Sequence, residues 1–149
     1  MLSEAQIRSV CLFYFFVLLD ESEALTWTLK TIGKFSKAKT GNQGQEVEWA
    51  SEMVYLTHES WRQLQKKGYG LGSPVSYEAG FLVPSDVDLG IWKQFRKEAE
   101  SDEFLAVIWS KILGVSDADM AKGLAITLGT VRHRVGRGLR HLGSLKYLG

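Results

Sequence analysis

The sequence predicts an all-α protein of two small helical units joined by a glycine-rich linker, with a helix-turn-helix as the C-terminal unit. Three observations predict this fold. Apolar residues recur at helical spacing along most of the chain, glycine and proline cluster between residues 68 and 84, and residues 120–149 contain no acidic side chain. We therefore expect an N-terminal helical domain at residues 1–67, a linker at 68–87 and a C-terminal domain at 88–149.

Three helices are predicted before the linker. Residues 10–19 are all apolar, but this run is too short to cross a bilayer and lacks the basic start and cleavage site of a signal peptide. We expect it to form a buried helix without membrane insertion. A second helix is expected at 21–38 and a third at 47–67, with a glycine-containing break at 40–44 between them. Their expected inward residues are Leu25, Leu29, Ile32 and Phe35 in the second helix, and Trp49, Met53, Leu56, Trp61 and Leu64 in the third.

The only cysteine of the chain, Cys11, lies inside the apolar run. A single cysteine excludes a disulfide within the chain, and its apolar neighbours predict a buried thiol. Free buried thiols are typical of a reducing compartment, so we expect a cytoplasmic protein.

Two helices joined by a tight turn are predicted within residues 113–135. Ser116 is placed to cap the first helix, and Asp117 and Asp119 lie in its first turn, where negative charge meets the positive end of the helix dipole. Thr127 is placed to cap the second helix by accepting the N–H of Gly129 or Thr130. The face of the first helix that packs inward is expected to hold Met120, Ala121 and Leu124.

The second of these helices is amphipathic. At about 100° per residue, its apolar stripe consists of Leu128, Val131, Val135, Leu139 and Leu142. The opposite face holds Thr130, His133, Arg137 and Arg140, with Arg132 and Arg134 on its flanks. Supporting helices are expected over residues 89–113, with inward residues Ile91, Trp92, Phe95, Ala99, Phe104, Val107, Ile108, Trp109 and Ile112.

Charge is distributed unevenly along the chain. Residues 1–119 hold twelve lysines and arginines against seventeen acidic residues, whereas residues 120–149 hold six against none, so the net charge of +1 conceals a polarised molecule. Arginines on a free helix face are most often solvated charge. The turn pattern and the charge asymmetry favour DNA instead, because arginine reaches both phosphates and the acceptor edge of guanine.

Residues 115–142 resemble the fourth conserved region of bacterial sigma factors, especially the small extracytoplasmic-function type. The matching residues are Leu113-Gly114-Val115-Ser116, Asp117 to Asp119, Met120-Ala121, Leu128-Gly129-Thr130-Val131-Arg132-His133-Arg134-Val135 and Gly136-Arg137-Gly138-Leu139-Arg140. The family's turn glycine is Ala125 here, which fits only if its backbone avoids the left-handed region. The resemblance implies that double-stranded promoter DNA faces Thr127, Gly129, Thr130, Arg132, His133, Arg134 and Arg137.

The three N-terminal helices resemble the second conserved region of the same family in their layout, which implies docking on core RNA polymerase. Residues 25–30 stand where the family carries a polar docking set, and acidic residues occur in the third helix where promoter-melting members are basic. Two functions therefore remain open. One is a sigma-type transcription regulator; the other is a sigma-like interaction module without initiation activity, whose partner is an anti-sigma protein.

Signals for an enzyme are scarce. The three histidines and Cys11 lack metal-ligand spacing, and no serine or cysteine has the setting of a nucleophile, so we expect no catalytic site, metal or cofactor. The glycines at 68–72 lack the lysine-serine ending of a phosphate loop. Glu98 and Asp102 are interpreted as an ordinary acidic pair on one exposed helix. Trp49 and Trp61 could stack on bases, but core packing is the better interpretation.

Overall fold

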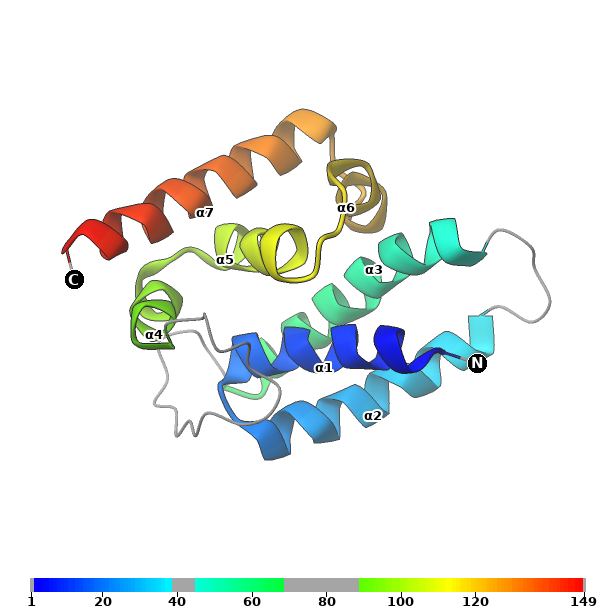
Figure 1. Cartoon of the computed structure of the whole chain (residues 1–149). Helices are drawn as coiled ribbons and strands as arrows, with labels where there is room; N and C mark the ends of the chain where they lie inside the picture. Colours follow the sequence, from blue (N-terminus) through cyan, green and yellow to red (C-terminus); the bar gives the residue numbers. More distant parts are fainter. Residues whose placement is uncertain (1, 39–44, 69–88, 149) are drawn as a thin grey trace.

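A computed structural model describes residues 2–38, 45–68 and 89–148, with side chains for all of these except 36–38, 45–48 and 146–148. The protein is all-α, as predicted. The helices are α1 (Glu4–Leu18), α2 (Glu21–Ala38), α3 (Gln45–Lys66), α4 (Leu89–Glu98), α5 (Ser101–Val107), the π-helical turn η1 (Ile108–Ile112), α6 (Asp117–Leu124) and α7 (Leu128–Leu148) (Figure 1). The predicted linker, apart from Gly68, and the break at 40–44 lie outside the described residues.

The apolar run forms the buried half of α1, as predicted. A capping box starts the helix: Gln6 donates its backbone N–H to Ser3 Oγ at 3.1 Å, and Ser3 donates its own to Gln6 Oε1 at 2.9 Å. Cys11 is buried, and burial raises the pKa of its thiol. No helix among the described residues is long and apolar enough to span a membrane.

The second helix has the predicted bounds but turns a different face inward. Its buried residues are Ala24, Trp27, Thr28, Thr31 and Phe35, whereas Leu25 and Leu29 are 48% and 68% exposed. The prediction for these two leucines is therefore wrong. The buried threonines satisfy their hydroxyls locally, because Thr28 donates to the carbonyl of Ala24 at 2.6 Å and Thr31 pairs with the Tyr14 hydroxyl. Because both buried hydroxyls have hydrogen-bond partners, the side of α2 that carries the large Trp27 ring can face the core.

The third helix packs as predicted. Met53, Trp61 and Leu64 are buried, and Trp49 and Leu56 pack against the same core. The ring of Trp49 lies 5.0 Å from that of Phe35 in α2. Both tryptophans are therefore core residues.

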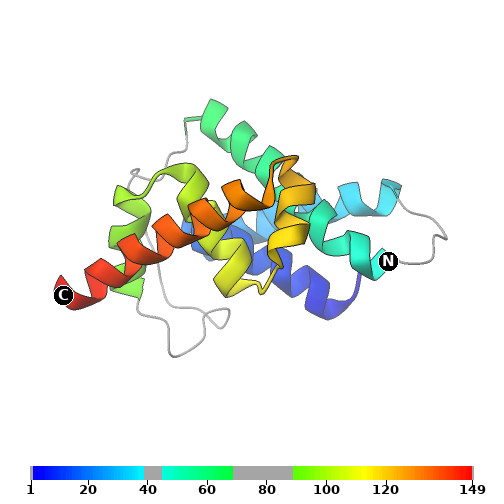
Figure 2. The same ribbon diagram turned by 90° about the horizontal axis from the view of Figure 1, so that it is seen from above.

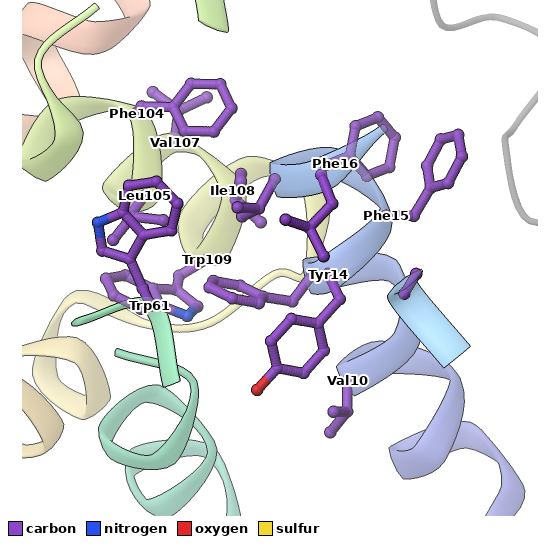
Figure 3. Packing of buried hydrophobic residues seen from close by; sticks show 14 of the residues in the cluster. Val10, Tyr14, Phe15, Phe16, Trp61, Phe104, Leu105, Val107, Ile108 and Trp109 are labelled. Atoms are coloured by element: carbon purple, nitrogen blue, oxygen red, sulfur yellow. The ribbon is translucent and has the colours of Figure 1, made fainter. Parts of the chain in front are cut away.

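Helices from the two halves of the sequence share one hydrophobic core. Figure 3 shows Trp109 and Ile108 of η1 meeting residues of α1, with Trp61 of α3 beside them. Hydrogen bonds cross the same boundary: Trp92 Nε1 donates to the Phe16 carbonyl at 2.8 Å, and Trp109 Nε1 donates to Thr57 Oγ1 at 3.1 Å. The tryptophans of the C-terminal half thus fasten it to α1 and α3, and the most extensive contact between the two halves is the packing of α6 on α3.

The arrangement places α7 on the outside. In Figure 1 it lies on the side of the molecule away from α2, with α5 and the other helices between them. Figure 2, seen from above, shows α7 crossing over α5 with α6 at one end. One long face of α7 therefore remains open.

Candidate nucleic-acid interface

Helices α6 and α7 are joined by a short turn, and both predicted caps are present. Ser116 Oγ accepts the backbone N–H of Asp119 at 3.1 Å at the start of α6. Thr127 Oγ1 accepts the backbone N–H of Thr130 at 3.1 Å at the start of α7. The two threonine hydroxyls lie 2.9 Å apart, which orders the first turn of α7.

The turn between the two helices is left-handed at Ala125, with φ 56° and ψ 47°. The expectation that this residue avoids the left-handed region is therefore wrong. Ala125 donates its N–H to the Lys122 carbonyl at 3.3 Å and Ile126 donates to Ala121 at 3.0 Å, the bond pattern that closes a helix in a Schellman motif. Because Ile126 packs against the core, the turn keeps this geometry at a cost of about 1–2 kcal/mol for a residue with a Cβ.

Most of the predicted DNA-facing residues lie on the exposed side of α7 and of the turn before it. Thr127, Gly129, Arg132, His133 and Arg137 are exposed. Thr130 and Arg134 are half-buried. Arg140, which was placed on the basic face but outside the predicted set, is also exposed, so the surface continues along α7 beyond that set.

The apolar stripe of α7 is mostly as predicted. Val131 is buried, and Val135, Leu139 and Leu142 pack against the core. Leu128 is the exception at 41% exposed. It lies at the first residue of the helix, before α7 reaches the surface of α5, so that part of the prediction is wrong.

Three arginines of α7 pair with acidic residues of neighbouring helices. Arg137 Nε donates to Glu103 of α5 at 2.8 Å. The other pairs are longer, at 3.4 Å from Arg132 to Asp117 and 3.6 Å from Arg134 to Asp102. The basic residues therefore face acidic first turns of α5 and α6, which sequence spacing alone did not reveal.

Glu98 and Asp102 are not a pair on one helix, because α4 ends at Glu98 and α5 begins at Ser101. Each instead meets a basic residue of α7. His141 Nε2 lies 3.0 Å from Glu98 Oε1, and hydrogen bonds from His141 and Gln94 hold the pKa of the Glu98 carboxyl below its usual value. The interpretation of these two acids as an ordinary exposed pair is therefore wrong.

Two glycines for which no packing role was predicted allow α7 to approach α5 and α6 to approach α3. A Cβ at Gly138 would lie 2.5 Å from Val107 Cγ2 and 2.9 Å from the Glu103 carbonyl oxygen. A Cβ at Gly123 would lie 2.5 Å from the Ser51 carbonyl oxygen of α3. Only glycine permits approaches this close, and isolated glycines inside an amphipathic helix are the sequence signal that could have indicated them.

The other titratable groups form no second site among the described residues. His58 packs edge-on against the Trp109 ring at 6.2 Å, and burial lowers its pKa. No group of three or more histidine, cysteine, aspartate or glutamate residues in the described part of the chain could hold a metal ion.

Comparison with known protein families, with curated proteins and with solved structures found no match to this chain.

Proposed function

We propose that this protein is a sigma-factor-like transcription regulator that binds promoter DNA through α7 and core RNA polymerase through its N-terminal helices. The observation that carries the proposal is the outer face of α7. This face starts at the capping residue Thr127, is exposed to solvent along α7, and presents Arg132, His133 and Arg137.

The geometry suits the major groove for physical reasons. An α-helix with its side chains is about 10–12 Å across, which fits the major groove of about 12 Å width. The small residues at its start, Thr127 and Gly129, allow a close approach of the backbone, and the positive end of the helix dipole favours phosphate there. Arg132 and Arg137 are both exposed and lie only about 7.5 Å apart along the axis of α7, so both can reach the same stretch of duplex.

The ion pairs of α7 do not exclude DNA binding. Arg132 is 67% exposed and its contact with Asp117 is long, at 3.4 Å. Exposed pairs of this kind contribute about 0–1 kcal/mol, so a DNA phosphate can replace the carboxylate at little cost. Binding that exchanges carboxylates for phosphates should depend strongly on salt.

The DNA proposal is tested by fluorescence anisotropy with duplexes selected from a random library. Arg132→Ala should weaken binding to the selected duplex by about 1–3 kcal/mol if its side chain contacts a guanine. The matched control is Arg62→Ala, because Arg62 of α3 is 59% exposed and pairs with Glu59 at a similar 3.3 Å. If both variants bind the selected duplex with the same affinity as the unchanged protein, the proposal that α7 contacts DNA through Arg132 is wrong.

The polymerase proposal is tested by size-exclusion chromatography of the protein with bacterial core RNA polymerase. Co-elution supports a sigma-type regulator. Absence of a complex, with DNA binding intact, favours the second candidate function, a sigma-like module that binds another protein such as an anti-sigma factor. The observation behind that candidate is the exposed pair Leu25 and Leu29, which stands where the family carries polar docking residues.

A further inference from the structure

The outer face of α2 is apolar at its centre and has small residues around it. Leu29 is 68% exposed and Leu25 is 48% exposed, one turn apart. Ser22, Thr26 and Gly33 are exposed on the same side of the helix. Two neighbouring exposed leucines among small residues form a surface that a second helix can approach closely.

Charge changes sign along this helix. Glu21 and Glu23 lie in its first turn, and Lys30 and Lys34 are exposed in its second half. Lys67 of α3 adds positive charge at the middle of α2, because its Nζ lies 5.3 Å from the centre of the Trp27 ring, over which Lys30 also lies. A copy of α2 in the opposite direction brings acidic residues beside basic ones, whereas a parallel copy brings like charges together.

The positions around the helix agree with an antiparallel pair. At about 100° per residue, Glu23 lies on the same flank of the exposed stripe as Lys30 and Lys34, and Leu25 lies on the other flank with Ile32. In an antiparallel two-fold pair each flank meets its own counterpart, with the residue order reversed. Glu23 then faces Lys34 of the second copy, while Leu25 faces Ile32 and Leu29 lies near the two-fold axis.

We propose that this face binds a second copy of the chain through an antiparallel, two-fold α2–α2 contact. The contact leaves the outer face of α7 open in both copies, because α7 lies on the side of the molecule away from α2 (Figure 1). The proposal does not depend on DNA binding. It concerns the free protein, and a partner that docks on the N-terminal helices competes with the second copy for the same leucines.

The test is sedimentation velocity of the full chain over a range of concentrations. The unchanged protein should sediment as a dimer of the 16.7 kDa chain and dissociate on dilution. Leu29→Asp should raise the dimer dissociation constant by about a hundredfold or more, because it buries a charge at the axis of the contact. Tyr55→Asp is the control, since Tyr55 is a comparably exposed large residue on α3 and should leave the dimer intact.

Exchange of the charges distinguishes this contact from any other. Glu23→Lys and Lys34→Glu should each weaken the dimer, because each places like charges opposite one another, and the double variant should recover it. Circular dichroism establishes that each variant is folded, and Leu25→Asp repeats the test if Leu29→Asp is not. A monomer at every concentration, a dimer insensitive to both leucines, or a double variant weaker than either single one overturns the proposal.

Discussion

Arg137 of α7 donates through its Nε to the carboxylate of Glu103 in α5 at 2.8 Å, and the Glu103 side chain is only 12% exposed. This pair joins the helix proposed to bind DNA to the helix that supports it. A carboxylate in that place occupies the arginine as a DNA phosphate would. The pair therefore contributes to stability, and the same contact would compete with the DNA contact proposed for Arg137.

Replacing Glu103 with glutamine should separate these two effects. The free energy of unfolding should fall by about 1 kcal/mol, because the half-exposed arginine then donates to a neutral amide oxygen instead of a carboxylate. DNA affinity should rise, because Arg137 becomes available and one negative charge is removed from the interface. Urea unfolding and anisotropy measure the two quantities. Glu59→Gln, which removes the partner of Arg62, should leave DNA affinity unchanged.

The left-handed turn predicts a stabilising substitution. Ala125→Gly should raise the free energy of unfolding by about 0.5–1 kcal/mol, because glycine adopts positive φ without a Cβ clash and this gain exceeds its entropic cost. Ala118→Gly in the first turn of α6 is the matched control, and it should destabilise by about 0.5 kcal/mol. Thermal unfolding of both variants checks this, and a loss of stability at Ala125 would contradict the turn geometry.

The close approach of α7 to α5 predicts opposite effects at two glycines of the same helix. Gly138→Ala should lower the free energy of unfolding by roughly 1–3 kcal/mol, because its Cβ meets Val107 and the Glu103 carbonyl. Gly143→Ala has nothing within 4 Å of the new Cβ and should raise it by about 0.5–1 kcal/mol. Chemical denaturation of the two variants measures both free energies of unfolding. Equal changes would mean that α7 does not pack closely on α5 at Gly138.

Burial of His58 predicts a dependence of stability on pH. Its folded-state pKa lies below the usual value of 6.5, so the unfolded chain binds the proton more readily as the pH falls below that value. The contribution of His58 is thus present above pH 6.5 and is lost as the pH falls through its folded-state pKa. His58→Gln should show a shallower loss of stability than the unchanged protein in this window.

His133→Gln is the matched control, because it removes a histidine that is exposed on α7 and not one that packs against Trp109. Glu98 does not interfere, since its lowered pKa affects stability only below its usual value of 4.5. Urea unfolding at a series of pH values measures the difference. Parallel curves for His58→Gln and the unchanged protein would mean that His58 is as solvated in the folded state as in the unfolded one.

The local signals in the sequence were reliable where side chain and backbone interact within one turn. Ser116 and Thr127 cap their helices as predicted because a cap depends only on the next three residues. The turn at Ala125 was misjudged because its backbone is held by the packing of Ile126, and a preference of about 1–2 kcal/mol is easily overridden by core packing.

By itself the sequence determined the all-helical fold, the bounds of α2, the buried run of α1 and the basic face of α7, because helical periodicity and caps are properties of short segments. Only the tertiary structure decided that Trp27 rather than Leu25 and Leu29 points inward, and that Glu98, Asp102 and Glu103 face α7. Those outcomes depend on which helices pack together and at what rotation, and contacts between residues distant in sequence set both.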